Sequence, residues 1–299
     1  MERRRIVLQV RSQIEAVIPD AHEAKCWFCR LCALRYLAVN GLTASETAIP
    51  AGSMTLFDKC PAKVPPALLP ALDALHGIAD EHWLAAPELP GWLYQYYNAP
   101  ERESALLGLR SHEKIAPAQI PAATQLFTPD WIVQSMVQNT LATLCGALPG
   151  WKYALDAPDG GVPRRSPEQI TLLDPCMGTG HILAYAFDAL LELYCRDGWA
   201  VSDAAERILS QNLCGLDIDP DAAAVCDFVL RMKAAPCLPD ILTRRVRTHF
   251  LHFGASREDN AAVYGSLLRP LHPKAACDKM LAAQYDAVIT NPPTWAAPG

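Results

Sequence analysis

The stretch TLLDPCMGTGHILAYAFDALLELY, residues 171–194, decides the fold class. A short apolar run typical of a buried strand is followed by a glycine turn and then by apolar residues at helical spacing. Gly178 and Gly180 stand where the predicted strand turns into the helix, so the backbone can approach a ligand closely. Asp174 at the strand tip suits an ammonium group better than a pyrophosphate, which its charge would repel. The pattern predicts a cofactor-binding turn and disfavours a dinucleotide.

Helices and strands alternate after this turn. The sequence predicts helices at 204–212 and 221–234 and strands at 213–219, 246–253 and 285–290. This alternation predicts an α/β fold, with a Rossmann-like open sheet of about four parallel strands and helices on its faces.

The second strand places Asp217 at its tip, where a carboxylate can accept hydrogen bonds from two ribose hydroxyls. Asp219 follows two residues later and is the less favoured contact. Taken alone, an acidic strand tip indicates a helix cap or a solvated charge. The neighbouring glycine turn makes ribose binding the better interpretation.

Asn291, Pro292 and Pro293 follow the predicted fourth strand. An exocyclic amine or amide nitrogen is a poor nucleophile because its lone pair is delocalised. An Asn oxygen and a rigidly held proline carbonyl can accept both of its hydrogens and so localise that lone pair. The double proline fixes the loop. In isolation N-P-P predicts a tight turn, but after D-P-x-x-G-x-G and G-x-D-x-D it indicates chemistry on an amino group.

The N-terminal part of the chain predicts helices. Apolar residues recur at helical spacing from Ile6 to about Leu42 and stop at Asn40-Gly41. The Pro-rich stretch 45–100 predicts brief helices joined by turns, and 131–144 predicts one longer helix. We therefore expect a helical N-terminal domain at 1–120 and a second domain at 121–299.

Composition limits the partners. The formal charge of −6 over 299 residues argues against a broadly basic nucleic-acid surface, so any DNA contact must be local. No apolar run reaches the roughly 20 residues of a membrane span, and MERRRIVLQV lacks the apolar core of a secretory signal. These features predict a cytoplasmic protein with no membrane association.

The chain has 11 cysteines, which we expect to be free thiols in a reducing compartment. Cys26, Cys29 and Cys32, with Cys60 as a fourth ligand, have a spacing that could hold an iron–sulfur cluster. The same spacing follows one stripe of a buried helix. We favour the helix stripe and predict no metal.

In this order, the motifs resemble those of the class I, S-adenosylmethionine-dependent N6-adenine DNA methyltransferases of the gamma type, which occur in restriction–modification and BREX phage-defence systems. The segments AKCWFCRLCALRYLAVNG (24–41), GWLYQYYN (91–98) and IPAATQLFTPDWIVQSMVQNTL (120–141) also resemble the N-terminal region of the PglX-type BREX methyltransferases. The resemblance therefore covers most of the chain.

The resemblance implies a set of residues for S-adenosyl-L-methionine. Thr128 in QLFTPDW would contact the methionine carboxylate and Asp174 its amino group. Gly178 and Gly180 would border the cofactor, and Asp217 would hold its ribose.

The resemblance also implies a catalytic loop. Asn291 and Pro292, with Pro293 behind them, would accept hydrogen bonds from the amino group of an adenine flipped out of double-stranded DNA. The aromatic residue that stacks on the base in this family is replaced by Thr294, and Trp295 follows one place later. Stacking contributes about 1–3 kcal/mol per base, so we include Trp295 as its candidate substitute.

Family members continue past this loop into further strands and a DNA-recognition region, which the residues after Trp295 cannot hold. We therefore expect a C-terminally truncated member whose edge strand at 285–290 invites pairing. DNA methylation would then need a complementing chain or other defence-system subunits. The alternatives are a non-catalytic fragment that binds S-adenosylmethionine or a partner, and a methyltransferase acting on RNA or a protein glutamine.

Overall fold

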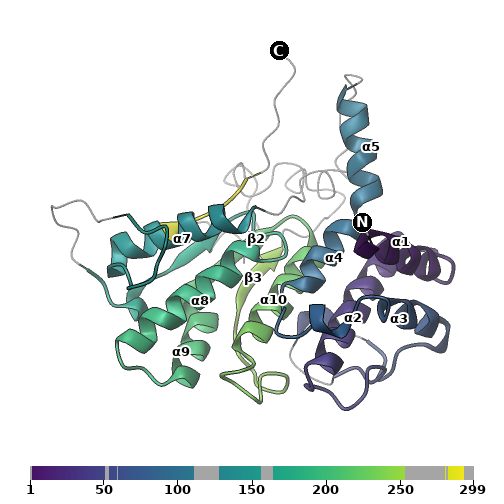
Figure 1. The fold of residues 1–299 in the computed structure, drawn as a ribbon, viewed down its shortest axis with the longest axis horizontal. Helices are drawn as coiled ribbons and strands as arrows, with labels where there is room; N and C mark the ends of the chain where they lie inside the picture. The colour runs from purple at the N-terminus through teal and green to yellow at the C-terminus, as the bar shows by residue number, and fades with distance from the viewer. Residues whose placement is uncertain are drawn as a thin grey trace.

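The computed structural model describes residues 2–50, 54–58, 60–110, 128–155, 164–252, 280 and 282–292 (Figure 1). Its α-helices are α1 (Glu2–Glu15), α2 (Ala21–Val39), α3 (Leu69–Leu75), α4 (Leu89–Tyr97), α5 (Ala99–Arg110), α7 (Asp130–Cys145), α8 (His181–Arg196), α9 (Val201–Arg207) and α10 (Pro220–Ala234). Its strands are β1 (Leu172–Asp174), β2 (Leu213–Asp217), β3 (His249–His252) and β4 (Ala287–Val288). Short 3₁₀ turns lie at Thr55–Phe57, Pro66–Leu68, Asp80–His82 and Pro167–Gln169.

The strands form one parallel sheet in the order β3-β2-β1-β4. The connections β1-α8-β2 and β2-α10-β3 step in the same direction, and right-handed crossovers then place both helices on one face. Helices α8 and α10 pack side by side, as Figure 1 shows. The α/β fold with a four-stranded parallel sheet is thus confirmed.

The order of the strands reverses at β1, which pairs with β2 on one side and β4 on the other. In open α/β sheets, ligands bind in the crevice beyond the carboxyl ends of the strands at such a switch point. A ligand site is therefore expected among the residues that follow β1, β2 and β4.

Neighbouring residues of a strand point to opposite faces, and here they enter two clusters. Leu172 and Leu213 belong to the main core, whereas Leu173 and Leu216 pack with Met280 on the other face. The main core also includes side chains of the N-terminal helices, which lie beside α4 and α10 in Figure 1. The N-terminal helices and the sheet are therefore packed together, and the proposed division near residue 120 stays a prediction.

The helical opening predicted from Ile6 to Leu42 is two helices. Pro19 has no amide hydrogen and cannot continue a helix, while Asp20 caps α2 by accepting a hydrogen bond from the Glu23 amide at 2.7 Å. Helix α2 ends at Val39, with Asn40 as its C-cap and Gly41 at a φ of +67°, so the predicted stop is confirmed.

Most other predicted elements are present, with shifted ends. The helix predicted at 131–144 is α7, and short helices and turns occupy the described parts of 45–100. The helix predicted at 204–212 is α9 followed by one π-helical turn, Ile208–Asn212. Strands β3 and β4 are shorter than predicted, and Val288 on the edge strand is 58% exposed.

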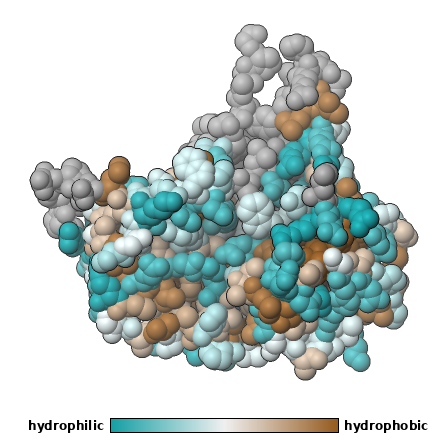
Figure 2. Space-filling model, viewed as in Figure 1, coloured by the Kyte–Doolittle hydropathy of each residue, from teal (hydrophilic) through white to brown (hydrophobic). Residues whose placement is uncertain are grey.

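The surface seen in Figure 2 is mostly polar or of intermediate hydropathy, with separate apolar areas. Within the described residues, no helix is both long and apolar enough to cross a bilayer.

Candidate cofactor and acceptor site

Residues from four distant segments meet at the carboxyl edge of the sheet. Asp174 ends β1 and Asp217 ends β2, while Asn291 lies three residues beyond β4. The Asn291 Nδ2 donates a hydrogen bond to the Thr128 Oγ1 at 3.0 Å, and the Gly178 amide donates to the Asp217 Oδ2 at 2.8 Å. The structure therefore places the described members of the predicted site at the ends of neighbouring strands, β1, β2 and β4, and on the segment that contacts Asn291.

Asp174 carries a carboxylate oxygen without a partner. The residue is 1% exposed, and its Oδ1 accepts a hydrogen bond from the Cys176 amide at 3.1 Å. Its Oδ2 is buried and has no hydrogen-bond partner in the part of the chain that the structure describes. Burial, with a smaller contribution from the charge of Asp217, raises the pKa of Asp174 to about 7, although the nearby Thr290 hydroxyl and the Cys176 amide oppose the change. A cationic group would satisfy this oxygen.

Asp217 joins the second strand to the glycine turn. Its Oδ1 accepts from the Asp219 amide and its Oδ2 from the Gly178 amide, both at 2.8 Å. Burial raises its pKa to about 6, and these amides act against that change. Each carboxylate oxygen has a second lone pair, so the largely buried but still partly exposed Asp217 can accept further hydrogen bonds from a diol.

The two motif glycines have different roles. Both have positive φ, +53° at Gly178 and +87° at Gly180. A Cβ at Gly180 would lie 2.6 Å from the Cys226 Sγ, whereas a Cβ at Gly178 would meet nothing within 4 Å. Gly180 therefore allows α10 to pack against the turn, and Gly178 leaves open space beside Asp217.

Asn291 is exposed and Pro292 half-buried. Because the Asn291 Nδ2 is held by Thr128, its Oδ1 is directed elsewhere, and within the described chain no group donates to it. This oxygen is available as an acceptor. Pro293, Thr294 and Trp295 lie outside the described residues, so their roles stay predictions.

A cavity of about 280 Å³ lies between α4, α7 and α8, and sequence reasoning missed it. The His181 Nε2 lies 3.0 Å from the Asp130 Oδ1, and the Trp92 ring meets the His181 ring edge to face. Asp130 follows Thr128 by two residues and His181 follows Gly180 directly. Their positions beside the motifs were the available signal.

Three of the candidate iron–sulfur cysteines, Cys26, Cys29 and Cys32, lie along helix α2. Cys29 and Cys32 are buried in the core, as a helix stripe predicts. Among the described residues, Cys26, Cys29, Cys32 and Cys60 do not form a group that could hold one metal ion.

No known family profile matches the chain. It is 38% identical over 169 residues to the adenine-specific methyltransferase PglX of Lacticaseibacillus casei (strain Zhang), which covers 49% of this chain and 14% of that protein. It is 28% identical to the adenine-specific methyltransferase BrxX of Escherichia coli O9:H4 (strain HS), over 89% of this chain and 28% of that protein. These matches support a relationship between this chain and the BREX methyltransferase family. The chain thus spans less than a third of the length of either BREX methyltransferase.

Proposed function

We propose that this chain forms the cofactor-binding part of an adenine-specific DNA methyltransferase of a BREX phage-defence system. The enzyme would transfer a methyl group from S-adenosylmethionine to the N6 of an adenine and act in the cytoplasm. The two named relatives support the reaction class. The observation that carries the proposal is the 3.0 Å hydrogen bond from Asn291 to Thr128, which joins the candidate acceptor to a candidate cofactor residue.

The residues at the sheet edge fit S-adenosylmethionine. The Asp174 Oδ2, which has no hydrogen-bond partner among the described residues, suits its ammonium group, and the remaining lone pairs of the Asp217 carboxylate suit its ribose hydroxyls. Thr128 accepts from Asn291 with an oxygen lone pair and keeps its hydroxyl hydrogen to donate to the methionine carboxylate. The space beside Gly178 admits a ligand next to backbone. When bound, the cofactor supplies an electrophilic methyl group.

The chain's own contribution to the reaction is to bind and orient the target nitrogen. The Asn291 Oδ1 and the Pro292 carbonyl would accept the two hydrogens of the adenine N6 amino group. Positive charge develops on that nitrogen as its lone pair forms the new bond, and two fixed acceptors stabilise this charge. Thr128 keeps the Asn291 amide from rotating, so the acceptor is held before the substrate arrives.

An adenine within a duplex cannot reach these acceptors, so we propose that it is flipped out of double-stranded DNA. Trp295 would stack on the flipped base in place of the residue at position 294. The chain has a net charge of −6, so we expect a complementing chain or other defence-system subunits to supply most of the DNA contacts.

The test separates cofactor binding from methyl transfer. Calorimetric titration of the 299-residue chain with S-adenosylmethionine should show one site, lost in Asp217→Ala and kept in Asp203→Ala, which removes an exposed carboxylate on α9. Radiolabelled methyl transfer to adenine-containing DNA should then appear when the part of a BREX methyltransferase that this chain does not span is added. Asn291→Ala should bind cofactor without transferring the label.

Three other results would redirect the assignment. Binding without turnover in the complemented mixture would indicate a non-catalytic fragment. Labelling of RNA or of protein glutamine instead of DNA would show another acceptor for the same loop. A folded chain that binds no S-adenosylmethionine would refute the proposal.

A further inference from the structure

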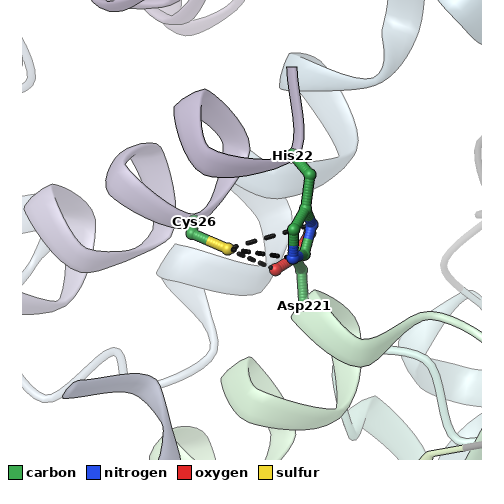
Figure 3. Close-up of side chains that lie close together, drawn as sticks. All are labelled: His22, Cys26 and Asp221. Carbon is green, nitrogen blue, oxygen red and sulfur yellow. Dashed lines mark hydrogen bonds and ion pairs between the residues drawn. The ribbon is translucent and has the colours of Figure 1, made fainter. Parts of the chain in front are cut away.

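Three side chains converge where the N-terminal helices meet α10 (Figure 3). His22 and Cys26 lie one turn apart on α2, and Asp221 lies in the first turn of α10. The Cys26 Sγ is 3.0 Å from the Asp221 Oδ1, and the His22 Nδ1 is 3.4 Å from the Asp221 Oδ2 and 4.0 Å from the Cys26 Sγ. A thiol, an imidazole and a carboxylate thus face one another across the boundary between two helices.

These separations match those around a tetrahedral metal. Zinc binds nitrogen and oxygen at about 2.0–2.2 Å and sulfur at about 2.3 Å, so its ligand atoms lie about 3.4–3.6 Å apart. The observed separations deviate from these values by about 0.6 Å or less, which small side-chain rotations can absorb. All three ligand atoms lie within 4.8 Å of one another.

The chemistry of the three ligands narrows the choice of ion. Thiolate and imidazole favour zinc, whereas magnesium and calcium prefer oxygen ligands. The Asp221 side chain is 8% exposed and fixed by its helix, while the His22 side chain is 65% exposed. The site therefore has two anchored ligands and one that can adjust, with a solvent-facing side where water can complete the coordination.

We propose that His22, Cys26 and Asp221 form a zinc site that fastens α2 to the N-terminus of α10. Helix α10 begins three residues after Asp217, so the metal would hold the N-terminal helices beside the candidate cofactor edge. The inference rests on these three side chains alone and does not depend on the proposed methyl transfer.

The experiment uses the 299-residue chain, treated with a chelator and kept reduced. Titration with zinc should show one equivalent bound, and titration with cobalt should produce the absorption band of a cobalt–thiolate bond. Cys26→Ser should abolish the cobalt–thiolate band, and His22→Gln should weaken the binding of both zinc and cobalt. His22 is exposed, so its variant tests the site even if Cys26→Ser does not fold. Cys195→Ser is the matched control because it removes an exposed thiol on α8.

Stability gives a second readout. At free zinc 100-fold above its dissociation constant, the unfolding equilibrium constant should fall by about 100-fold in the unmodified chain and in Cys195→Ser. It should change far less in His22→Gln. Absence of zinc binding, or binding that survives in both Cys26→Ser and His22→Gln, would show that the cluster is only a hydrogen-bonded contact.

Discussion

The affinity for S-adenosylmethionine should fall as the pH is lowered through 7, because of Asp174. Burial raises the pKa of this carboxyl to about 7, far above its ordinary value of 3.8. Its Oδ2 has no partner among the described residues, and the ammonium group of the cofactor would supply one. Only the ionised carboxylate attracts that ammonium group strongly, so the cofactor and a proton compete for the same site.

The size of the change in affinity follows from the fraction of Asp174 that is ionised at each pH. A carboxyl with a pKa of about 7 is about half ionised at pH 7 and about one-tenth ionised at pH 6. The dissociation constant should therefore rise about fivefold between pH 7 and pH 6 from this group alone. Asp217, whose pKa is raised to about 6 by burial, adds up to about twofold over the same interval. Near neutral pH, binding should also release part of a proton.

The assay is calorimetric titration at pH 7 and pH 6 in buffers of different ionisation enthalpy, with the chain and with Asp174→Asn. The variant should bind about 10–150 times more weakly at pH 7, because it loses a hydrogen bond between charged groups worth about 1.5–3 kcal/mol. It should also lose the fivefold pH effect. An affinity that does not change between these pH values, or a pH effect in Asp174→Asn that stays near fivefold and exceeds the twofold contribution of Asp217, would refute the assignment of Asp174 to the ammonium group.

Three further predictions concern stability, measured as the free energy of unfolding in urea. Asp174→Asn should stabilise the cofactor-free chain, because the unmodified chain, whose Asp174 pKa is raised on folding, loses stability as the pH rises from 3.8 to 7. The difference in unfolding free energy between the variant and the unmodified chain should grow by about 2 kcal/mol from pH 5 to pH 7, and a difference that stays constant would contradict this. Gly180→Ala should lower the unfolding free energy by about 1–3 kcal/mol more than Gly198→Ala, since both glycines have φ near +85° but only Gly180→Ala would bring a Cβ against Cys226. If the two variants lose equal stability, the contact with Cys226 contributes nothing and backbone strain explains both losses. Tyr94→Phe should lower the unfolding free energy by about 1–3 kcal/mol, because it removes the buried hydrogen bond to Asp219. An unchanged urea concentration at the unfolding midpoint would show that this bond contributes nothing to stability.

The sequence was sufficient to predict where the candidate site lies. Parallel strands end at the same edge of a sheet, so acids and amides that follow predicted strands must lie near one another, as Asp174, Asp217 and Asn291 do. The different roles of Gly178 and Gly180 could not be predicted, because they depend on where α10 packs. Local periodicity carries no information about such a contact between distant segments.

The contacts between the N-terminal helices and the sheet were missed for the same reason. Tyr94 lies 125 positions from Asp219 in the sequence, and Cys26 lies 195 positions from Asp221. Periodicity identified α2 and α10 as helices with apolar faces, and composition predicted brief helices in the stretch that holds α4, but neither indicates which faces meet. The polar groups at these boundaries could be recognised only after the helices were packed.

One of these contacts connects the N-terminal helices to the glycine turn after β1. The Tyr94 hydroxyl donates to the Asp219 Oδ2 at 2.7 Å, the Asp219 amide donates to Asp217, and Asp217 in turn accepts from the Gly178 amide. Each link in this series is a directional hydrogen bond, and Tyr94 is fully buried, so a shift of α4 would displace the cap of α10 and then the carboxylate proposed to hold ribose. The N-terminal helices therefore help to set the geometry of the candidate cofactor site.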